Sequence, residues 1–207
     1  ITNCLTRYNY HNIMSDSNVI YYDFETTGLN PFHEKIIDYC FINENTDEKL
    51  ESLVNPEQPL PSKITEITGI SDEQLQFQEP IVQHIDSFRK FFSEDKVFFL
   101  VAHNGDGFDK HFLNELNREF GIFKNKEKIK YLDTLLIAKK FIPDQYSFKL
   151  ASLCKRFGIT PGSHRAFSDT FALQKLYKHM LRIIETKTEY SYEYLYNNPN
   201  VVYNLIY

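Results

Sequence analysis

The sequence predicts an α/β domain in which helices flank a mixed β-sheet. Three observations predict this class. Three strand-like segments follow one another near the start of the chain, which indicates a meander. Beyond them, short apolar runs alternate with stretches of helical periodicity. The 207 residues, 42% hydrophobic and 25% charged, have the length and composition of one globular domain.

The first predicted strand begins with the apolar run NVIYY at residues 18–22 and carries Asp23, Phe24 and Glu25 at its end, before the polar residues and Gly28 that terminate it. Because alternate side chains of a strand share a face, Asp23 and Glu25 point the same way and Phe24 points the opposite way. Two such carboxylates repel each other unless a cation lies between them, and Mg²⁺ prefers oxygen ligands of this kind. A solvated acidic strand end is the alternative for this pair taken alone.

Two further strands and two short helices are predicted between residues 35 and 76. The polar connection ENTD suits a hairpin between the strands, and prolines then interrupt regular structure. Ser71 and Gln74 have the spacing of a capping box at the start of the second helix. The predicted elements are strands at 35–43 and 48–54 and helices at 62–68 and 71–76.

After residue 80, apolar residues recur at helical spacing or gather in short continuous runs that indicate buried strands. The predicted elements are a helix at 81–92, a strand at 97–102, a helix after Gly105, a strand near 128–132, and helices at 133–141, 148–157 and 166–184. This order implies a mixed sheet with helices on both faces.

The organised part of the chain is predicted to span residues 18–184. Residues 1–17 are polar and lack periodicity, so we expect an N-terminal extension without an assigned function. The Tyr- and Asn-rich residues 185–207 are expected to form a tail that packs on the domain or extends it.

The cysteines and the apolar runs bear on the compartment. The three cysteines are far apart and follow no metal-ligand spacing, which indicates buried thiols in a reducing compartment. No apolar run approaches the roughly 20 residues of a membrane span, and no signal sequence opens the chain. We therefore expect an intracellular protein, of the cytoplasm or nucleus or of viral origin, that is not secreted.

The net charge of −5 argues against a nucleic-acid partner until its distribution is considered. Residues 118–156 contain ten basic and four acidic side chains, so this stretch carries +6 and the remainder −11. A basic region can bind a phosphate backbone despite the overall sign. A solvated, lysine-rich helical face explains the same pattern equally well, so charge alone does not decide.

A second acidic position lies in VAHNGDGFDKHF, where the strand predicted at 97–102 leads into a helix. Asp106 and Asp109 are both candidates for a carboxylate at the same sheet edge as Asp23, because neighbouring parallel strands end at one edge. We favour Asp109, since Phe108 before it can anchor that turn in the core. Helix capping is the alternative, because acids near a helix N-terminus interact favourably with its dipole.

A third acidic position lies in HRAFSDTFALQKLYKHML. His164 sits in a loop with Gly and Pro, and Asp169 follows in the first turns of the last predicted helix. Asp169 shares a helix face with Leu173 and Leu176, toward the sheet. A carboxylate on an inward face needs a partner, and a metal would serve. An Asp that caps a helix beside a surface His is the alternative.

Together these segments resemble the DnaQ-like 3′–5′ exonucleases of the DEDDh subgroup. The resemblance rests on DFETTGL, VNPEQPLPSKITEITGISDEQL, AHNGDGFD, and SFKLASLCKRFGI followed by HRAFSD, in order from about residue 18 to 184. AHNGD is closest to the three-prime repair exonucleases, although their Pro-rich insertion is not evident, and HRAFSD is closer to bacterial proofreading subunits. The spacing of His164 and Asp169 fits the His subgroup, because the Tyr subgroup would need Tyr where Arg165 stands.

The resemblance implies a role for each matching residue. The four acidic metal ligands would be Asp23, Glu25, Asp109 and Asp169, with His164 as the general base. The positions implied to lie near the terminal nucleotide are Thr26, Thr27, Leu29, His103, Asn104 and Phe108. For His103 and Asn104, a structural role in shaping the site is favoured over catalysis. Asp133 also matches a family pattern and is interpreted as a structural acid.

The resemblance also implies a fold and a reaction. The fold is ribonuclease H-like, a five-stranded mixed sheet flanked by helices, which agrees with the order of elements predicted from the residues. The reaction is release of 5′-mononucleotides from a 3′ end, with two divalent cations, Mg²⁺ or Mn²⁺, held by the acids. His164, with an unperturbed pKa of about 6.5, can accept a proton from the attacking water.

The implied partner is a nucleic acid with a free 3′ end, expected to be single-stranded, with DNA slightly favoured in a proofreading or repair role. No membrane partner is expected, and association with a polymerase or a second copy is compatible with the sequence. An exoribonuclease that trims RNA is the first alternative, because only 2′-hydroxyl contacts discriminate and the sequence does not reveal them. A nuclease-like binding module is the second, although all five catalytic residues are present.

Overall fold

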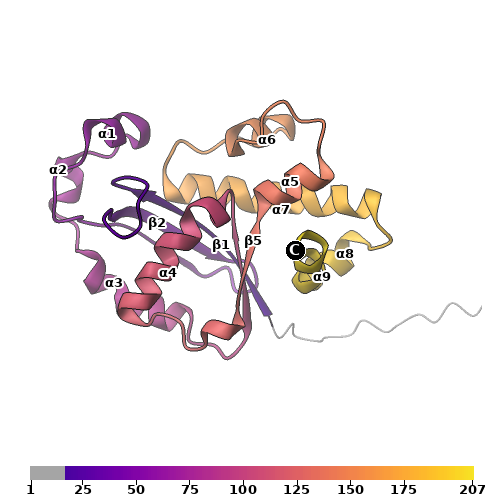
Figure 1. Cartoon of the computed structure of the whole chain (residues 1–207), viewed down its shortest axis with the longest axis horizontal. Helices are drawn as coiled ribbons and strands as arrows, with labels where there is room; N and C mark the ends of the chain where they lie inside the picture. Colours follow the sequence, from indigo (N-terminus) through magenta and orange to yellow (C-terminus); the bar gives the residue numbers. More distant parts are fainter. Residues whose placement is uncertain (1–16) are drawn as a thin grey trace, which may run out of the picture.

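The computed structural model describes residues 17–207 (Figure 1). Its sheet has the strand order β3-β2-β1-β4-β5. The strands are β1 (Ser17–Thr26), β2 (Ile36–Asn43), β3 (Lys49–Leu53), β4 (Val97–Ala102) and β5 (Ile129–Asp133). β1 is central, antiparallel to β2 and parallel to β4. This five-stranded mixed sheet, with its first three strands in a meander, confirms the predicted fold class. Apart from Ser17, the predicted N-terminal extension lies outside the described residues.

Helices cover both faces of the sheet (Figure 1). One face carries α3 (Ile81–Phe91) and α4 (Asp109–Phe120). The other carries α5 (Thr134–Phe141), α6 (Leu150–Arg156), α7 (Ala166–Lys187), α8 (Tyr192–Asn197) and α9 (Pro199–Ile206). The short elements are α1 (Ser62–Thr68), α2 (Asp72–Leu75) and the 3₁₀ turns η1 (Gly105–Gly107) and η2 (Lys126–Lys128). Within residues 17–207, none of these helices is long and apolar enough to cross a membrane.

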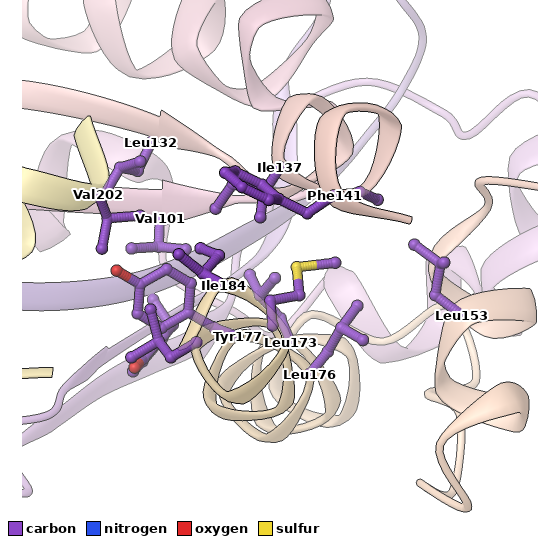
Figure 2. Packing of buried hydrophobic residues seen from close by; sticks show 14 of the residues in the cluster. Val101, Leu132, Ile137, Phe141, Leu153, Leu173, Leu176, Tyr177, Ile184 and Val202 are labelled. Carbon is purple, nitrogen blue, oxygen red and sulfur yellow. The ribbon is translucent and has the colours of Figure 1, made fainter. Parts of the chain in front are cut away.

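The α7 face of the sheet packs mainly aliphatic side chains. Val101 of β4 lies in one cluster with Leu173 and Tyr177 of α7 (Figure 2). The ring of Tyr21, on β1, meets the ring of Tyr177 edge-on at 5.8 Å between centroids. Val202 of α9 is fully buried in the same cluster, so residues near the C-terminus contribute to this core.

The opposite face packs mainly aromatic side chains. The ring of Phe41 lies at the centre, 5.6 Å from the rings of Tyr22, Phe24, Phe88 and Phe92. Aromatic pairs at such distances contribute about 0.5–1.5 kcal/mol each beyond the area they bury. This cluster therefore holds α3 and the following turn against the sheet and fixes the central strands.

Several element boundaries differ from the prediction by one to three residues, and the difference at the start of α4 concerns the acidic segment after β4. β1 continues past the apolar run to Thr26, because its acidic end pairs with β2, where Glu25 lies opposite Asp38. α4 begins at Asp109, whereas Asp106 lies in the separate turn η1. The break follows from Asn104, whose φ of 61° is left-handed and directs the chain out of β4.

Asp133, at the end of β5, holds the β4–α4 connection in place. Its carboxylate accepts hydrogen bonds from the backbone N–H groups of Asn104 (2.8 Å), Asp106 (3.1 Å) and Leu135 (2.8 Å). The side chain is buried, and it satisfies N–H groups of both η1 and the first turn of α5. These contacts agree with the interpretation of Asp133 as a structural acid.

We expect Asp133→Ala to lower the free energy of unfolding by about 2–4 kcal/mol, because it leaves three part-buried backbone N–H groups without an acceptor. Chemical denaturation measures the change. The control is Asp95→Ala, which removes an exposed acid paired with Lys128 and should change the stability far less. Equal losses for the two variants would contradict the structural role.

Candidate active site

The C-terminal end of β1 presents two carboxylates on the face that α7 covers. Asp23 and Glu25 are partly buried, whereas Phe24 between them is buried in the aromatic cluster on the opposite face. The alternation is that expected of a strand. Asp23 and Glu25 therefore lie together at the C-terminal end of the central strand, beside the N-terminus of α7.

Asp109, the first residue of α4, joins this pair. Its side chain is only 3% exposed, and its Oδ1 accepts a hydrogen bond of 3.1 Å from the backbone N–H of Phe24. This bond places the Asp109 carboxylate against the strand between Asp23 and Glu25. Asp106 instead pairs with Lys110 at 2.8 Å and accepts a hydrogen bond from the hydroxyl of Tyr207 at 2.7 Å. The structure thus brings Asp109 to β1 and commits Asp106 to other contacts.

Asp169 and His164 approach from the other side, on α7 and the loop before it. One ligand atom each of Glu25, His164 and Asp169 lie within 4.8 Å of one another. The loop passes so close that a Cβ on Gly162 would lie 1.7 Å from Oδ1 of Asp169. Glycine is therefore required where the loop crosses the carboxylate.

Burial and mutual repulsion raise the pKa values of these acids. Burial, followed by the nearby carboxylate of Asp169, raises the pKa of Glu25 to about 8. Burial raises the pKa of Asp109 to about 7, against its hydrogen bond from Phe24. Burial and the charge of Asp109 raise the pKa of Asp23 well above its ordinary value. A cluster of carboxylate oxygens with one imidazole, short of positive charge, fits a hard divalent cation.

The turn after β1 holds three residues predicted to face the substrate. The hydroxyl of Thr26 donates to the carbonyl of Gly28 at 2.6 Å. The hydroxyl of Thr27 donates to Glu34 at 2.5 Å. Both threonines are buried and shape the turn, whereas Leu29 is 83% exposed. Of the three, only Leu29 presents its side chain openly to solvent.

The other three predicted substrate residues lie at the exit of β4. His103 lies 2.9 Å from the hydroxyl of Thr134 through Nδ1 and 2.8 Å from the carbonyl of Phe148 through Nε2. Burial lowers its pKa. Both ring nitrogens are engaged within the protein, which supports a structural role. Asn104 forms the left-handed turn described above, and Phe108 is partly buried against the aromatic cluster.

The sequence did not predict two residues of the site, Asp38 and its partner Arg165. Asp38, on β2, accepts a hydrogen bond from Nε of Arg165 at 2.9 Å and from the backbone N–H of Ala166 at 3.2 Å. These donors belong to the two residues that follow His164 in the chain. A signal was present, because Asp38 is an acid inside the otherwise apolar strand segment IIDYCFI. An acid on a buried strand requires a partner, and the partner could not be identified without the fold.

Comparison with known proteins is consistent with this geometry. Residues 20–177 match the RNase_T family, described as exonuclease. The DNA polymerase III PolC-type of Bacillus subtilis (strain 168) is 34% identical over 176 residues, which cover 83% of this chain and 12% of that protein. The PolC-type polymerase of Halalkalibacterium halodurans is 34% identical over 183 residues, which cover 86% and 12%. The chain thus spans only a small part of these relatives.

Solved structures of exonuclease I from E. coli share the fold. One, in complex with a dA16 oligonucleotide, matches with a TM-score of 0.69 and 18% identity over 88% of this chain and 43% of that chain. Another, a zinc-bound complex with single-stranded DNA, matches with a TM-score of 0.69 and 17% identity over 88% and 43%. The likeness confirms the predicted ribonuclease H-like fold.

The raised pKa values predict a pH-dependent stability. Folded Glu25 and Asp109 hold protons up to pH values of about 8 and 7, whereas in the unfolded chain they release them near 4.5 and 3.8. The folded state therefore loses stability as pH rises between these values. In thermal unfolding with EDTA, we expect Tm to fall from pH 5.5 to 8.5, and Mg²⁺ or Mn²⁺ to restore it most at pH 8.5. In Asp109→Asn, which keeps an acceptor for Phe24, both effects should shrink; unchanged effects would contradict the assignment.

Substitution separates the two acids of the β4–α4 connection. Asp109→Ala should weaken Mn²⁺ binding about 10-fold or more, since it removes a carboxylate from the cluster, whereas Asp106→Ala should change it less than about twofold. Isothermal titration calorimetry measures both affinities. The reverse order would move the third acidic position to Asp106.

Proposed function

Because this chain belongs to the RNase_T exonuclease family, we propose that it is a 3′–5′ exonuclease of the DEDDh subgroup that releases 5′-mononucleotides from nucleic-acid 3′ ends. One observation carries the proposal: four carboxylates from β1, α4 and α7 converge with a histidine at one edge of the sheet. The acids are Asp23, Glu25, Asp109 and Asp169, and the histidine is His164.

The acids are suited to hold two divalent cations, Mg²⁺ or Mn²⁺. Asp23, Glu25 and Asp169 would hold one, and Asp23 and Asp109 the other. Bound divalent cations stabilise the negative charge that develops in phosphodiester hydrolysis and activate water. The raised pKa values support this arrangement, because they show that burial and, for Asp23 and Glu25, neighbouring carboxylates disfavour the charged acids in the absence of a cation. The cations would also reconcile this acidic site with a polyanionic substrate.

His164 is the general base of the proposal. Its side chain is exposed, on the loop before α7, with one ring nitrogen close to Glu25 and Asp169. A neutral imidazole there can take the proton of the attacking water, and the adjacent carboxylates stabilise the imidazolium that forms. Because the loop ends at α7, this histidine approaches from the side opposite to Asp109.

The substrate is proposed to be single-stranded, with DNA favoured over RNA. The turn after β1, the strand that carries Asp23 and Glu25, has two largely exposed apolar side chains, Leu29 at 83% and Phe32 at 70% exposure. Such side chains can stack on unpaired bases without reading their sequence. DNA is favoured because the sequence relatives are DNA polymerases and because exonuclease I was solved with DNA oligonucleotides. RNA trimming is the alternative, which contacts to a 2′-hydroxyl would distinguish.

The setting is proposed to be proofreading or repair beside a polymerase. The chain corresponds to about 12% of the length of the PolC-type relatives, so a polymerase partner would lie outside these 207 residues. Removal of a terminal nucleotide from a frayed 3′ end requires only the single strand that the site can receive.

The proposal is tested by digestion of matched DNA and RNA oligonucleotides, labelled at the 3′ or 5′ end, with Mg²⁺, Mn²⁺ or EDTA. We expect metal-dependent release of 5′-mononucleotides from the 3′ end, faster on single-stranded DNA. A preference for RNA would support the trimming alternative. No cleavage of any oligonucleotide by the folded protein would overturn the nuclease and support a binding module.

The matched control is His164→Ala, which keeps all four acids. It should lower kcat by about 10²–10⁴-fold, the usual contribution of a general base, while Mn²⁺ affinity stays within a few-fold of wild type. Full turnover by this variant would remove the assigned role and point to a contaminating nuclease.

A further inference from the structure

We propose that Asp38 and Arg165 form a latch that holds His164 over the carboxylates, which makes Asp38 and Arg165 positioning residues for the reaction. The proposal rests on the proposed function for its consequence on turnover. Its structural content, that the Asp38–Arg165 latch fixes the His164 loop, stands on the contacts of the loop itself.

The latch joins the centre of the sheet to the residue after His164. Oδ2 of Asp38 accepts from Nε of Arg165 at 2.9 Å and from the N–H of Ala166 at 3.2 Å. Ala166 is the first residue of α7 and is completely buried, so its N–H has no helical acceptor and depends on Asp38. One carboxylate oxygen therefore fixes both a side chain and the start of a helix.

A second contact holds Arg165, and it comes from Asp169, one of the clustered acids. The backbone N–H of Arg165 donates to Oδ2 of Asp169 at 3.2 Å, while Oδ1 of Asp169 lies against Gly162. On the loop's other flank, the N–H of Ser163 donates to the hydroxyl of Ser168 at 3.1 Å. His164 is thus the one residue of the segment 163–166 whose neighbours on both sides are anchored while its own side chain remains exposed.

The backbone of His164 needs such anchors. Its φ of 54° is left-handed, a conformation that is unfavourable for a residue with a Cβ. A loop free to relax would leave this conformation and carry the imidazole away from Glu25 and Asp169. Strained residues of this kind persist only where the surroundings hold them.

The location of Asp38 connects the latch with the acids. Asp38 lies opposite Glu25 in the β1–β2 register, and its side chain is 8% exposed, against 41% for Arg165. A buried acid costs free energy unless it is paired and hydrogen-bonded. The guanidinium supplies the partner of Asp38 at 2.9 Å. A role limited to stability would not require the partner to be the neighbour of His164.

The test compares Asp38→Asn, which keeps the shape and an acceptor oxygen, with Arg165→Met and the double variant. A control is Lys128→Met, which breaks an ion pair of 2.8 Å at the opposite end of β5 from Asp133, with a cation of similar exposure (35% for Lys128 and 41% for Arg165). For both single variants we expect kcat to fall about 10- to 100-fold with KM within about twofold, as misplacement of a catalytic group predicts. The double variant should be no slower than the worse single variant, because both remove one latch.

A second readout does not depend on activity. Amide hydrogen exchange of residues 162–166 should speed up about 10-fold in both single variants and stay unchanged in Lys128→Met. If Asp38→Asn does not fold, Arg165→Met, at the more exposed partner, is used for both the turnover and the exchange measurements. Arg165→Lys should recover part of the lost kcat.

The outcomes separate this proposal from the nuclease itself. If wild type cleaves no nucleic acid, the proposed function fails, and the exchange arm still tests the latch. Unchanged exchange and unchanged kcat in the variants would overturn the latch. A higher KM at wild-type kcat would also overturn it, because Arg165 would then act by binding substrate.

Discussion

The crowding of carboxylates at the end of β1 is the constraint on which the rest of the site depends. Burial raises the pKa values of Asp23, Glu25 and Asp109, and the charges of neighbouring carboxylates raise those of Asp23 and Glu25 further. Such a cluster is unfavourable for folding unless cations neutralise it, so the surrounding structure must hold it together. The two packed faces of the sheet supply that stability, with a mainly aliphatic core under α7 and an aromatic core under α3.

The fold delivers each functional group from the end of a regular element. β1 places its two acids by strand alternation, α4 places Asp109 with its first residue, and α7 places Asp169 in its first turns. Strand and helix ends have polar backbone groups that need partners, and the site uses them: the N–H of Phe24 binds Asp109, and the N–H of Ala166 binds Asp38. The hydrogen bonds that satisfy these backbone groups therefore also position the carboxylates of Asp109 and Asp38.

Structural acids surround the functional ones and fix the connections between them. Asp133 holds the β4–α4 connection through three backbone N–H groups, and Asp38 holds the start of α7. Asp133 lies on β5, next to β4, and Asp38 lies on β2, next to β1. The site is thus an inner group of carboxylates available to cations and an outer group saturated by hydrogen bonds or by Arg165.

By itself, the sequence determined the fold class, the order of the elements and the residues of the acidic cluster, because these depend on periodicity and local motifs. It left Asp106 and Asp109 as alternatives, with Asp109 favoured, started α4 too early and did not connect Asp38 with Arg165. Tertiary structure decided these points. Which Asp meets β1 and where α4 begins depend on the turn at Asn104, and the Asp38–Arg165 pair joins residues 127 positions apart. Contacts of that range are set by the packing of α7 on the sheet, which no local pattern encodes.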